Sequence, residues 1–563
     1  MYSSLDETRR IFDLLCINAK RLGLPAKILM SRVYFQSALN TIYYKTPFKI
    51  TETLAALKGI EGALAALIAD LQSAPESHGR EVKINLERAT LFGFQALIAK
   101  VNGYSRSDPE VKSYLKDTDI HAAQSNLYRR MAANMYRTKE NNEFFHLHGS
   151  LDPSLTLNMI GLDSYRPDIA DYEEIITVIQ SHVQRFSAAE LECLNETFRQ
   201  AGVTVYDYEE FKDTPHGRVN IREPWWKVTR LPGKSPPAAF NSSKKGRILE
   251  DIKVLELCCV IAGPVIGRTL AEYGANVLKI TSPSVPDVPF FQIDNNMGKR
   301  AVEMDLKSEN GRRQFEALLV DVDVIIDGYR PGVLHRLGYA PEHMAVLAEQ
   351  RGKGIIYIDE NCFGHEGEWH HRPGWQQIAD CLTGFARCYG RFLGSTEPMV
   401  SPLPVADYGA GCMGVIAALT GLYNRAKFGG SYHGKVSLMQ FNLLLYDVGK
   451  YPCSVQAQLR SSLAPAFSKL RFCDSVERSS KLALGTMGEE FPELFMSPTS
   501  RETQKNLREI WFSHHFQADV EVVRPVAEID GVESSFVRAS RPNGADTSPS
   551  WDFLQEENDY RKL

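Results

Sequence analysis

Short apolar strands alternate with helices over residues 252–358, and this alternation constrains the fold of the chain more than any other feature. Runs with β-branched residues predict four strands, at 252–259, 276–280, 322–326 and 354–358. Helices are expected at 269–273 and 311–320. Because strands that alternate with helices form right-handed βαβ units, the pattern predicts an α/β fold with a parallel sheet.

The first of these strands does not lead into a dinucleotide-binding turn. The G-x-G-x-x-G fingerprint is absent, and the strand runs instead into Ile261-Ala262-Gly263-Pro264. The glycine turn that holds the pyrophosphate of a nicotinamide or flavin cofactor is therefore missing. An enzyme that depends on such a cofactor is not expected.

Two Ala- and Leu-rich segments, 53–71 and 408–424, predict buried helices, and a further helix is expected at 5–24. When the chain is shifted by 355 residues, residues 47–79 match eight identities without a gap, from Pro47/Pro402 to the His-Gly pair that ends both loops. Composition alone produces several identities between such helices. The shared proline and the shared His-Gly exit favour an internal duplication.

A segment rich in Pro, Ser, Lys and Gly at 231–247 separates the two halves. We therefore expect a truncated repeat at 1–240, a linker at 241–249 and a second domain at 250–563.

Composition excludes several classes of protein. The 563 residues are 44% hydrophobic and 24% charged, with a net charge of −5 and no basic stripe, so a nucleic-acid partner is not expected. The longest apolar run, 254–266, is too short for a bilayer and contains Glu256. The N-terminal MYSSLDETRR does not resemble a signal peptide, and ten cysteines without a CxxC pair suit a reducing compartment. A cytoplasmic protein without a membrane partner is expected.

Six segments of the second half follow one another at compatible spacing. They read VLELCCVIAGPVIGRTLAEYGANVLKI, NNMGKRAVEMDLKSENGR, DVIIDGYRPGVLHRLG, CFGHEG, HRPGWQQIADCLTGFARCYG and PVADYGAG. Together they resemble the family III coenzyme A transferases, or CaiB/BaiF family, which includes formyl-CoA transferases, carnitine CoA-transferases and α-methylacyl-CoA racemases. The first half resembles the later part of the same family more weakly, at 47–79, 136–153 and 201–211.

The resemblance implies a Rossmann-like parallel sheet with a smaller α+β domain, internally duplicated here with a truncated first copy. Family members are interlocked homodimers, so this chain is expected to form a homodimer or a pseudo-dimer within itself. The implied function is CoA transfer between an acyl-CoA and a small carboxylic acid. The CoA thioester is then a substrate, and neither a tightly bound cofactor nor a metal is expected.

The resemblance also implies a nucleophile, and here the chain departs from the family. A carboxylate in the motif R-P-G-Y-D is expected to attack the thioester, but residues 372–376 read RPGWQ, with Gln376 at the position of the Asp. A primary amide is a very poor nucleophile, so altered chemistry is expected. Asp380, one helical turn on, and His365, at the family's usual Gln, are candidate replacements, as are His370 and His371. A zinc site in this segment is not expected, because no known ligand spacing is matched.

Other positions match the family's CoA-binding residues. The resemblance assigns CoA contacts to Arg336 with Leu337, to the Ala262-Gly263 turn, and to Lys299. A CoA-contacting arginine of the family is replaced by Ser282. Asp407 matches an acid common to the family and could equally be a helix N-cap.

Three functions remain open from the sequence. The first is a family III CoA-transferase with altered chemistry. The second is a catalytically inactive protein that binds acyl-CoA or acts as a scaffold. The third is an acid/base enzyme of the racemase, isomerase or hydrolase type that uses a nearby histidine.

Overall fold

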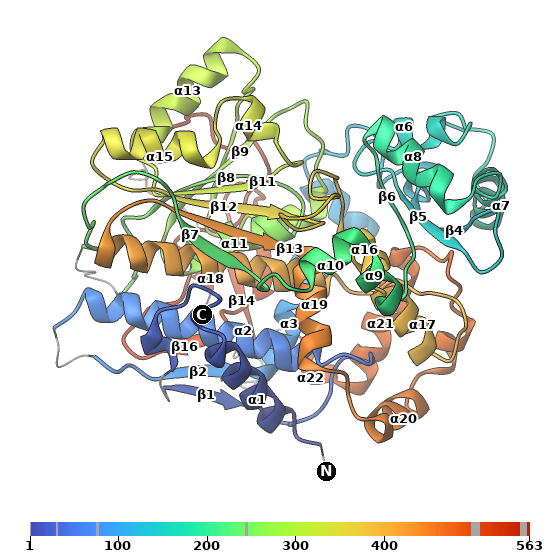
Figure 1. Cartoon of the computed structure of the whole chain (residues 1–563), viewed down its shortest axis with the longest axis horizontal. Helices are drawn as coiled ribbons and strands as arrows, with labels where there is room; N and C mark the ends of the chain where they lie inside the picture. The colour runs from blue at the N-terminus through green and yellow to red at the C-terminus, as the bar shows by residue number, and fades with distance from the viewer. Residues whose placement is uncertain are drawn as a thin grey trace.

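The computed structural model describes residues 2–29, 32–74, 78–241, 246–496, 507–551 and 560–562. Residues 242–245 of the predicted linker lie outside the described residues. Figure 1 shows a main body built around one large sheet, with a smaller lobe beside it.

The large sheet contains seven strands among the described residues. Six of them are β8 (Lys253–Cys258), β9 (Asn276–Thr281), β10 (Arg300–Glu303), β11 (Val324–Gly328), β12 (Ile356–Asn361) and β13 (Tyr432–Ser437). These six pair in parallel in the order β10-β9-β8-β11-β12-β13, which is the 3-2-1-4-5-6 order of a doubly wound sheet. The edge strand β7 (Lys227–Arg230) pairs with β13 in the antiparallel direction. The four predicted strands and the parallel sheet are confirmed.

Helices cover both faces of this sheet, because side chains of a strand point alternately to its two faces. Leu255 and Leu257 of β8 pack into a cluster with α13 (Glu309–Leu319) and α15 (Pro341–Gln350). Val254, on the opposite face, belongs to the main core with α11 (Ala262–Glu272) and α18 (Val405–Phe428).

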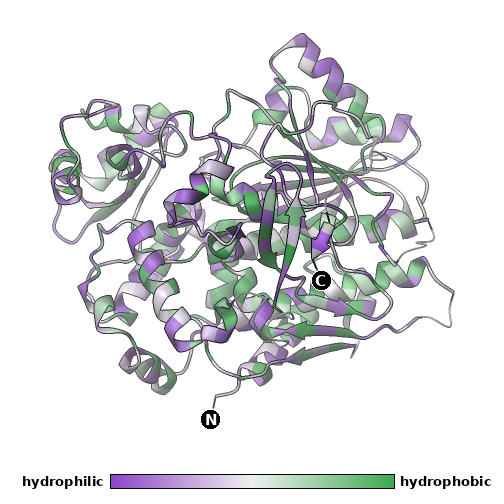
Figure 2. Cartoon of the chain, turned by 180° about the vertical axis from the view of Figure 1, so that it is seen from behind, coloured by the Kyte–Doolittle hydropathy of each residue, from purple (hydrophilic) through white to green (hydrophobic). Residues whose placement is uncertain are grey.

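The helices α18 and α2 (Ile50–Leu71) pack against each other at the centre of the molecule, where Figure 2 shows mainly hydrophobic residues. Both were predicted as buried helices, and both predictions are confirmed. Among the described helices, only α18 is long and apolar enough to cross a membrane. However, 94% of its most apolar 18-residue segment is buried inside the protein. It is therefore a core helix.

The smaller lobe has an α+β architecture and its own hydrophobic core. Its antiparallel sheet consists of β4 (Ala133–Arg137), β5 (Phe144–His148) and β6 (Ala201–Thr204). Its helices are α5 (Leu127–Arg130), α6 (Ser154–Met159), α7 (Tyr172–Val183) and α8 (Ala188–Phe198).

Two further sheets combine strands from both ends of the chain. One consists of β1 (Val33–Gln36), β2 (Val82–Asn85) and β16 (Ala527–Ile529). The other consists of β17 (Tyr560–Lys562), β14 (Arg508–Ser513), β15 (Ala518–Val523) and β3 (Lys100–Val101). Because β7 also joins the large sheet, three sheets contain strands from both sides of residues 241–249. The halves expected from the sequence share sheets and do not form separate bodies.

The remaining helices connect these layers. In the first half they are α1 (Ser4–Ile17), α3 (Leu86–Phe92), α4 (Gln95–Ile98), α9 (Tyr208–Asp213) and α10 (Pro215–Asn220), with 3-10 turns η1 (Ala26–Leu29) and η3 (Pro109–Tyr114). In the second half they are α12 (Gln292–Asn295), α14 (Val333–Arg336), α16 (Gln376–Leu382), α17 (Phe385–Phe392), α19 (Leu438–Val448), α20 (Cys453–Ser461), α21 (Val476–Glu490) and α22 (Pro492–Phe495), with η4 (Pro289–Phe291) and η5 (Pro465–Lys469). The helix expected at 5–24 ends earlier, at Ile17.

Candidate active site

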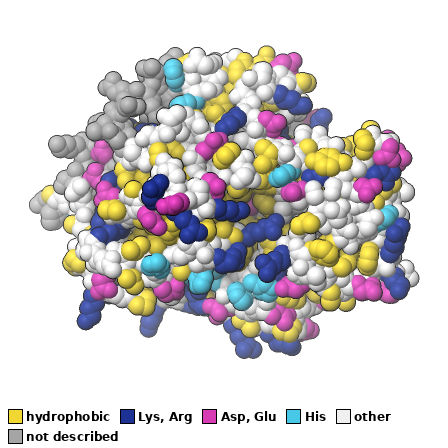
Figure 3. Space-filling view, turned by 90° about the horizontal axis from the view of Figure 1, so that it is seen from above, with side chains coloured by type: hydrophobic (Ala, Val, Ile, Leu, Met, Phe, Trp, Pro, Cys, Tyr) yellow, Lys and Arg dark blue, Asp and Glu magenta, His cyan; other side chains and the backbone are white. Residues whose placement is uncertain are grey.

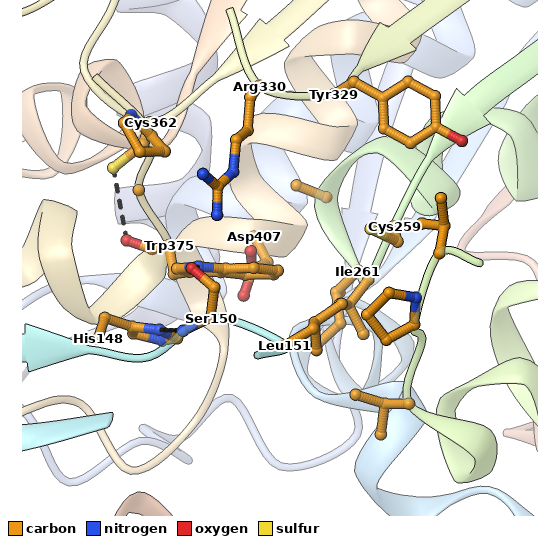
Figure 4. Close-up of a pocket in the computed structure, with 18 of the residues that line it drawn as sticks. His148, Ser150, Leu151, Cys259, Ile261, Tyr329, Arg330, Cys362, Trp375 and Asp407 are labelled. Carbon is orange, nitrogen blue, oxygen red and sulfur yellow. Dashed lines mark hydrogen bonds between the residues drawn. The ribbon is translucent and has the colours of Figure 1, made fainter. Parts of the chain in front are cut away.

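A cavity of about 820 Å³ opens at the carboxyl edge of the parallel sheet. Ligand sites of doubly wound sheets lie at this edge, because the loops that follow neighbouring strands meet there. Cys259 and Ile261 follow β8, Tyr329 and Arg330 follow β11, and Glu360 lies near the end of β12. Figure 4 shows the Arg330 guanidinium pointing into this space.

The first half of the chain supplies the opposite wall. His148, the last residue of β5, lines the cavity together with Ser150 and Leu151 of the following loop. Arg106 and Arg130, also from the first half, line it as well. One chain therefore encloses the cavity with residues from both of its halves.

Trp375 joins the two walls. Its indole Nε1 donates to Ser150 Oγ at 3.0 Å, and its ring stacks on His148 with centroids 5.3 Å apart. The His148 Nδ1 accepts the Ser150 N–H at 3.0 Å, and burial lowers the pKa of His148 well below its usual value. His148 is thus a neutral support for Trp375 (Figure 4).

Gln376 is almost fully buried and binds the start of α18. Its Oε1 accepts the Ala406 N–H at 3.1 Å and the Asp407 N–H at 3.4 Å. Its Nε2 donates to Leu403 O at 2.9 Å and to Asp380 Oδ2 at 3.3 Å. These contacts need a donor and an acceptor on one side chain, which an amide offers and a carboxylate does not. Gln376 lines the cavity but is held as a structural bridge.

The residues expected to replace the nucleophile are not brought into this cavity. Asp380 is completely buried, accepts from Asn442 Nδ2 at 2.9 Å, and does not line the wall. His365 is paired through Nε2 with Val436 O at 3.0 Å and does not line it either. His370 and His371 are exposed outside it, with His371 2.8 Å from Glu196.

Asp407 and Glu360 are among the carboxyl groups that line the cavity. Burial raises the pKa of each to about 8, and the Asp407 charge contributes to the shift of Glu360. Neither carboxyl group makes a hydrogen bond within the part of the chain that the structure describes. Asp407 is not the N-cap of α18, because that position is Pro404.

Sequence reasoning assigned Asp407 no catalytic role and missed Glu360 entirely. The signal available was the acidic residue at the end of the apolar run IIYIDEN, on a strand whose end faces the ligand edge. His148 and the two arginines of the first half carried no comparable signal, because their approach to the cavity depends on long-range packing.

The predicted CoA-binding residues divide into two groups. Arg336, Leu337 and Ala262 line the cavity. Lys299 does not, because it is fully buried, 2.6 Å from Glu256 and donating to Pro264 O at 2.8 Å. Gly263 also lies outside the lining, and a Cβ there would come within 2.6 Å of the Cys258 Cβ. Gly263 and Lys299 therefore hold α11 against the sheet.

Comparison with known proteins identifies the family of this chain. Residues 249–458 match the model of CoA-transferase family III. The chain is 33% identical to the acetyl-coenzyme A transferase nodX of Hypoxylon pulicicidum over 524 residues, which cover 90% of this chain and 86% of that protein. It is also 33% identical to an acyl-CoA transferase of Gibberella moniliformis, over 71% of each chain.

Among solved structures, a CaiB/BaiF family protein from Brucella suis is 26% identical, covering 38% of this chain and 56% of that one with a TM-score of 0.32. With a relative similar over almost its whole length and a family model that spans the cavity-forming strands, the chain belongs to CoA-transferase family III.

Proposed function

We propose that the protein transfers CoA from an acyl-CoA thioester to a carboxylic acid, with Asp407 as the nucleophile. The observation that carries this proposal is the placement of the Asp407 carboxyl group in the cavity, without a hydrogen-bond partner among the described residues, while Gln376 binds its backbone N–H. Gln376 then positions the nucleophile and is not itself required to react.

The proposed reaction conserves all atoms without a further reactant. An Asp407 oxygen attacks the thioester carbonyl carbon, the C–S bond breaks, and CoA leaves as the thiolate with a mixed anhydride on Asp407. The thiolate then attacks the Asp407 carbonyl carbon and releases the first acid, which leaves CoA in thioester linkage to Asp407. The carboxylate of the second acid attacks the carbonyl carbon of this thioester, the C–S bond breaks, and a second mixed anhydride forms as the CoA thiolate leaves. The thiolate then attacks the acyl carbonyl carbon of the second acid, which forms the new acyl-CoA and releases Asp407 as a carboxylate.

Positive charge on the sheet side suits the phosphates of CoA. Lys307, Arg330 and Arg336 line the cavity there, and Lys and Arg side chains gather near the middle of the face in Figure 3. The helix α11 starts at Ala262 without a side-chain cap, so N–H groups of its first turn are available at the same wall. Guanidinium groups pair with phosphate through two parallel hydrogen bonds.

The test is CoA exchange followed by mass spectrometry, with trapping by hydroxylamine. Asp407→Asn is expected to abolish exchange and the trapped adduct at residue 407. Asp380→Asn should keep the adduct, because Asp380 lies outside the cavity. Exchange that persists in Asp407→Asn would remove Asp407 as the nucleophile.

The same experiment separates the alternatives. An acyl-CoA that binds to the wild-type protein without exchange, adduct or loss of an α-proton to D₂O would identify a binding protein. Exchange of the α-proton alone would identify acid/base chemistry, for which Glu360 and Asp407 are both placed.

We also infer that the chain arose by internal duplication and that its large sheet is Rossmann-like. Each of the helices α2 and α18 is followed by a strand, β2 or β13, and then by a helix capped at its start by the last strand residue, Asn85 or Ser437. The two long helices also pack against each other. A superposition of 50–92 on 405–448 tests the inference, and helices that diverge in direction after the strand would contradict it.

A further inference from the structure

The buried carboxyl group of Asp380 has no part in the mechanism above. Asp380 lies on α16, one helical turn after Gln376, and is completely buried. No basic side chain of the described residues forms an ion pair with it. Because a buried carboxyl group is costly unless hydrogen bonds compensate it, its contacts indicate what it does.

Three donors from three segments bind this carboxyl group. Asn442 of α19 donates through Nδ2 to Oδ1 at 2.9 Å, and Gln376 of α16 donates through Nε2 to Oδ2 at 3.3 Å. The backbone N–H of Ser401, in the loop before α18, also donates to it. Asn442 is itself held, because its Nδ2 donates in addition to Thr383 Oγ1 at 3.2 Å. The carboxyl group therefore joins α16, α19 and the loop that leads into α18.

The acceptor at position 380 helps to decide which way the Gln376 amide faces. The Nε2 group of Gln376 has two hydrogens, and its two acceptors are Leu403 O and Asp380 Oδ2. The other end of the amide, Oε1, accepts from the N–H groups of Ala406 and Asp407. If the amide were turned over, its NH2 group would meet these two N–H groups and its oxygen would meet the two acceptors. Only the observed orientation satisfies both ends.

The Gln376 amide in turn completes the start of α18. The first N–H groups of a helix have no partner inside it, and the N-cap residue Pro404 makes no side-chain hydrogen bond to them. Gln376 accepts two of these N–H groups from outside the helix. One of them belongs to Asp407, the third residue of α18. The first turn of α18 sets the position from which the Asp407 carboxyl group reaches the cavity.

Ser401 provides a second connection from Asp380 to the same turn. Its backbone N–H donates to Asp380, and its hydroxyl donates to Leu403 O at 2.8 Å. Leu403 O also accepts from Gln376 Nε2. Ser401 and Leu403 line the cavity, whereas Asp380 and Asn442 do not. Asp380 therefore acts on the cavity only through the residues that it holds.

We propose that Asp380 is a positioning residue for CoA transfer, which holds the start of α18 through Gln376 and thereby directs the Asp407 carboxyl group towards the thioester. This inference rests on the proposed function. Reacting groups that are held at the right distance and angle react much faster, so a small displacement of the nucleophile lowers the rate more than it weakens substrate binding.

The test exchanges the amide and the carboxyl group between positions 380 and 442. Asp380→Asn leaves one acceptor oxygen for three donors and puts an NH2 group against one of them. The kcat of CoA exchange should fall about ten- to a hundredfold, and KM for the acyl-CoA should change less than about twofold. In Asp380→Asn/Asn442→Asp, the amide at 380 donates to the carboxylate at 442 and keeps its oxygen for Gln376. This double variant should recover kcat to within about threefold of the wild type.

Asp447→Asn is the matched control. Asp447 also lies on α19 and accepts from Trp225 Nε1 at 2.6 Å, but it does not line the cavity. Its variant should keep the wild-type kcat. All variants are compared on the upper plateau of the pH profile, above the pKa of about 8 that burial gives Asp407, so that a changed charge at 380 does not alter the ionised fraction. Rates are divided by the folded fraction, which thermal unfolding measures.

A trapped adduct that still forms at residue 407 in Asp380→Asn, but more slowly, would support the inference. An unchanged kcat would overturn it, because Asp380 would then stabilise the fold at most, and Asp407 would remain the nucleophile. A higher KM without a lower kcat would also overturn it. Exchange that persists in Asp407→Asn would contradict the proposed function and the inference together.

A milder variant covers the case in which Asp380→Asn does not fold. Asn442→Ala withdraws one donor from Asp380 and leaves Gln376 in place. Its kcat should fall about threefold at constant KM. A kcat equal to that of the wild type would overturn the inference in the same way.

Discussion

At the scale of single residues, the contacts of Gln376 show why an amide suits the last position of the RPGWQ motif better than a carboxylate. An aspartate there would have no donor for Leu403 O, and its charge would lie beside Asp380, which is already buried. The amide avoids both costs and still accepts two N–H groups at the start of α18. In the reaction proposed above, the attacking carboxylate is that of Asp407, whose backbone N–H is bound by Gln376.

The first prediction concerns the pH dependence of this carboxyl group. Burial raises the pKa of Asp407 and of Glu360 to about 8 each, and the attacking group must be ionised. The value of kcat/KM should therefore rise with pH and level off above about 8, with apparent constants that belong to the pair. Glu360→Gln removes a like charge and should shift the midpoint to lower pH. A midpoint that Glu360→Gln leaves unchanged would show that the two groups do not interact.

The same shifts affect stability with a defined sign. A carboxyl group whose pKa is higher in the folded state than the unfolded value of about 4 stabilises the fold fully below that pH, and the contribution is lost as pH rises to about 8. Thermal unfolding between pH 5 and 9 should show this loss in the wild type. The loss should be smaller in Glu360→Gln, and a steeper loss in that variant would contradict the assignment.

A further residue-scale prediction concerns Arg336. Arg336 is the last residue of α14, and its exposed side chain lines the cavity. This side chain makes no hydrogen bond to another described residue. If it contacts a CoA phosphate, Arg336→Ala should weaken CoA binding about tenfold, measured by titration calorimetry. Arg313→Ala, on a helix that does not line the cavity, should leave the affinity unchanged. Equal affinities for both variants would place Arg336 outside the CoA site.

At the scale of elements, the contact between α2 and α18 contains a buried ion pair. Lys58 Nζ lies 3.0 Å from Glu61 Oε2, and both side chains are almost completely buried. Glu61 also accepts from the Tyr273 hydroxyl at 3.0 Å and from Cys412 Sγ of α18 at 3.5 Å. The pair therefore joins the first half of the chain to α18 and to the C-cap residue of α11 in the second half.

Removing one partner of this pair should be costly. Lys58→Met leaves the Glu61 charge buried without its cation, which destabilises the fold by about 3–5 kcal/mol. Lys58→Met/Glu61→Gln keeps an acceptor for Tyr273 and should recover much of that loss in urea unfolding. A double variant as unstable as the sum of the two single variants would mean that the charges do not interact.

Elements with regular apolar patterns could be predicted from the sequence, and elements defined by distant partners could not. The strands β8 and β9 and the helices α2 and α18 are mostly apolar with a few charged residues, a composition that suits their burial. In the cavity, Arg336 and Ala262 were assigned through the resemblance of their segments to the family. Glu360, His148 and Arg130 were not predicted to line the cavity. They meet there only because the smaller lobe packs against the large sheet, and a local sequence pattern does not predict such packing.

At the scale of the whole molecule, the first half is part of the fold. It supplies β7 to the large sheet, β1, β2 and β3 to the two smaller ones, and one wall of the cavity. We propose that the first half takes the place of the partner subunit that the family resemblance implies. A second copy is not needed to close the cavity, and we expect a monomer of 63.2 kDa by light scattering.

Complementation between inactive variants tests this arrangement directly. Asp407→Asn removes the proposed nucleophile from the second half, and Leu151→Trp fills the wall that the first half supplies. If each cavity is built from one chain, every chain in a mixture of the two variants carries a defect, and co-expression should restore no CoA exchange. If the halves were exchanged between two copies, some cavities would combine an intact first half with an intact second half. Recovery of up to a quarter of the wild-type rate would then show that two chains share each site.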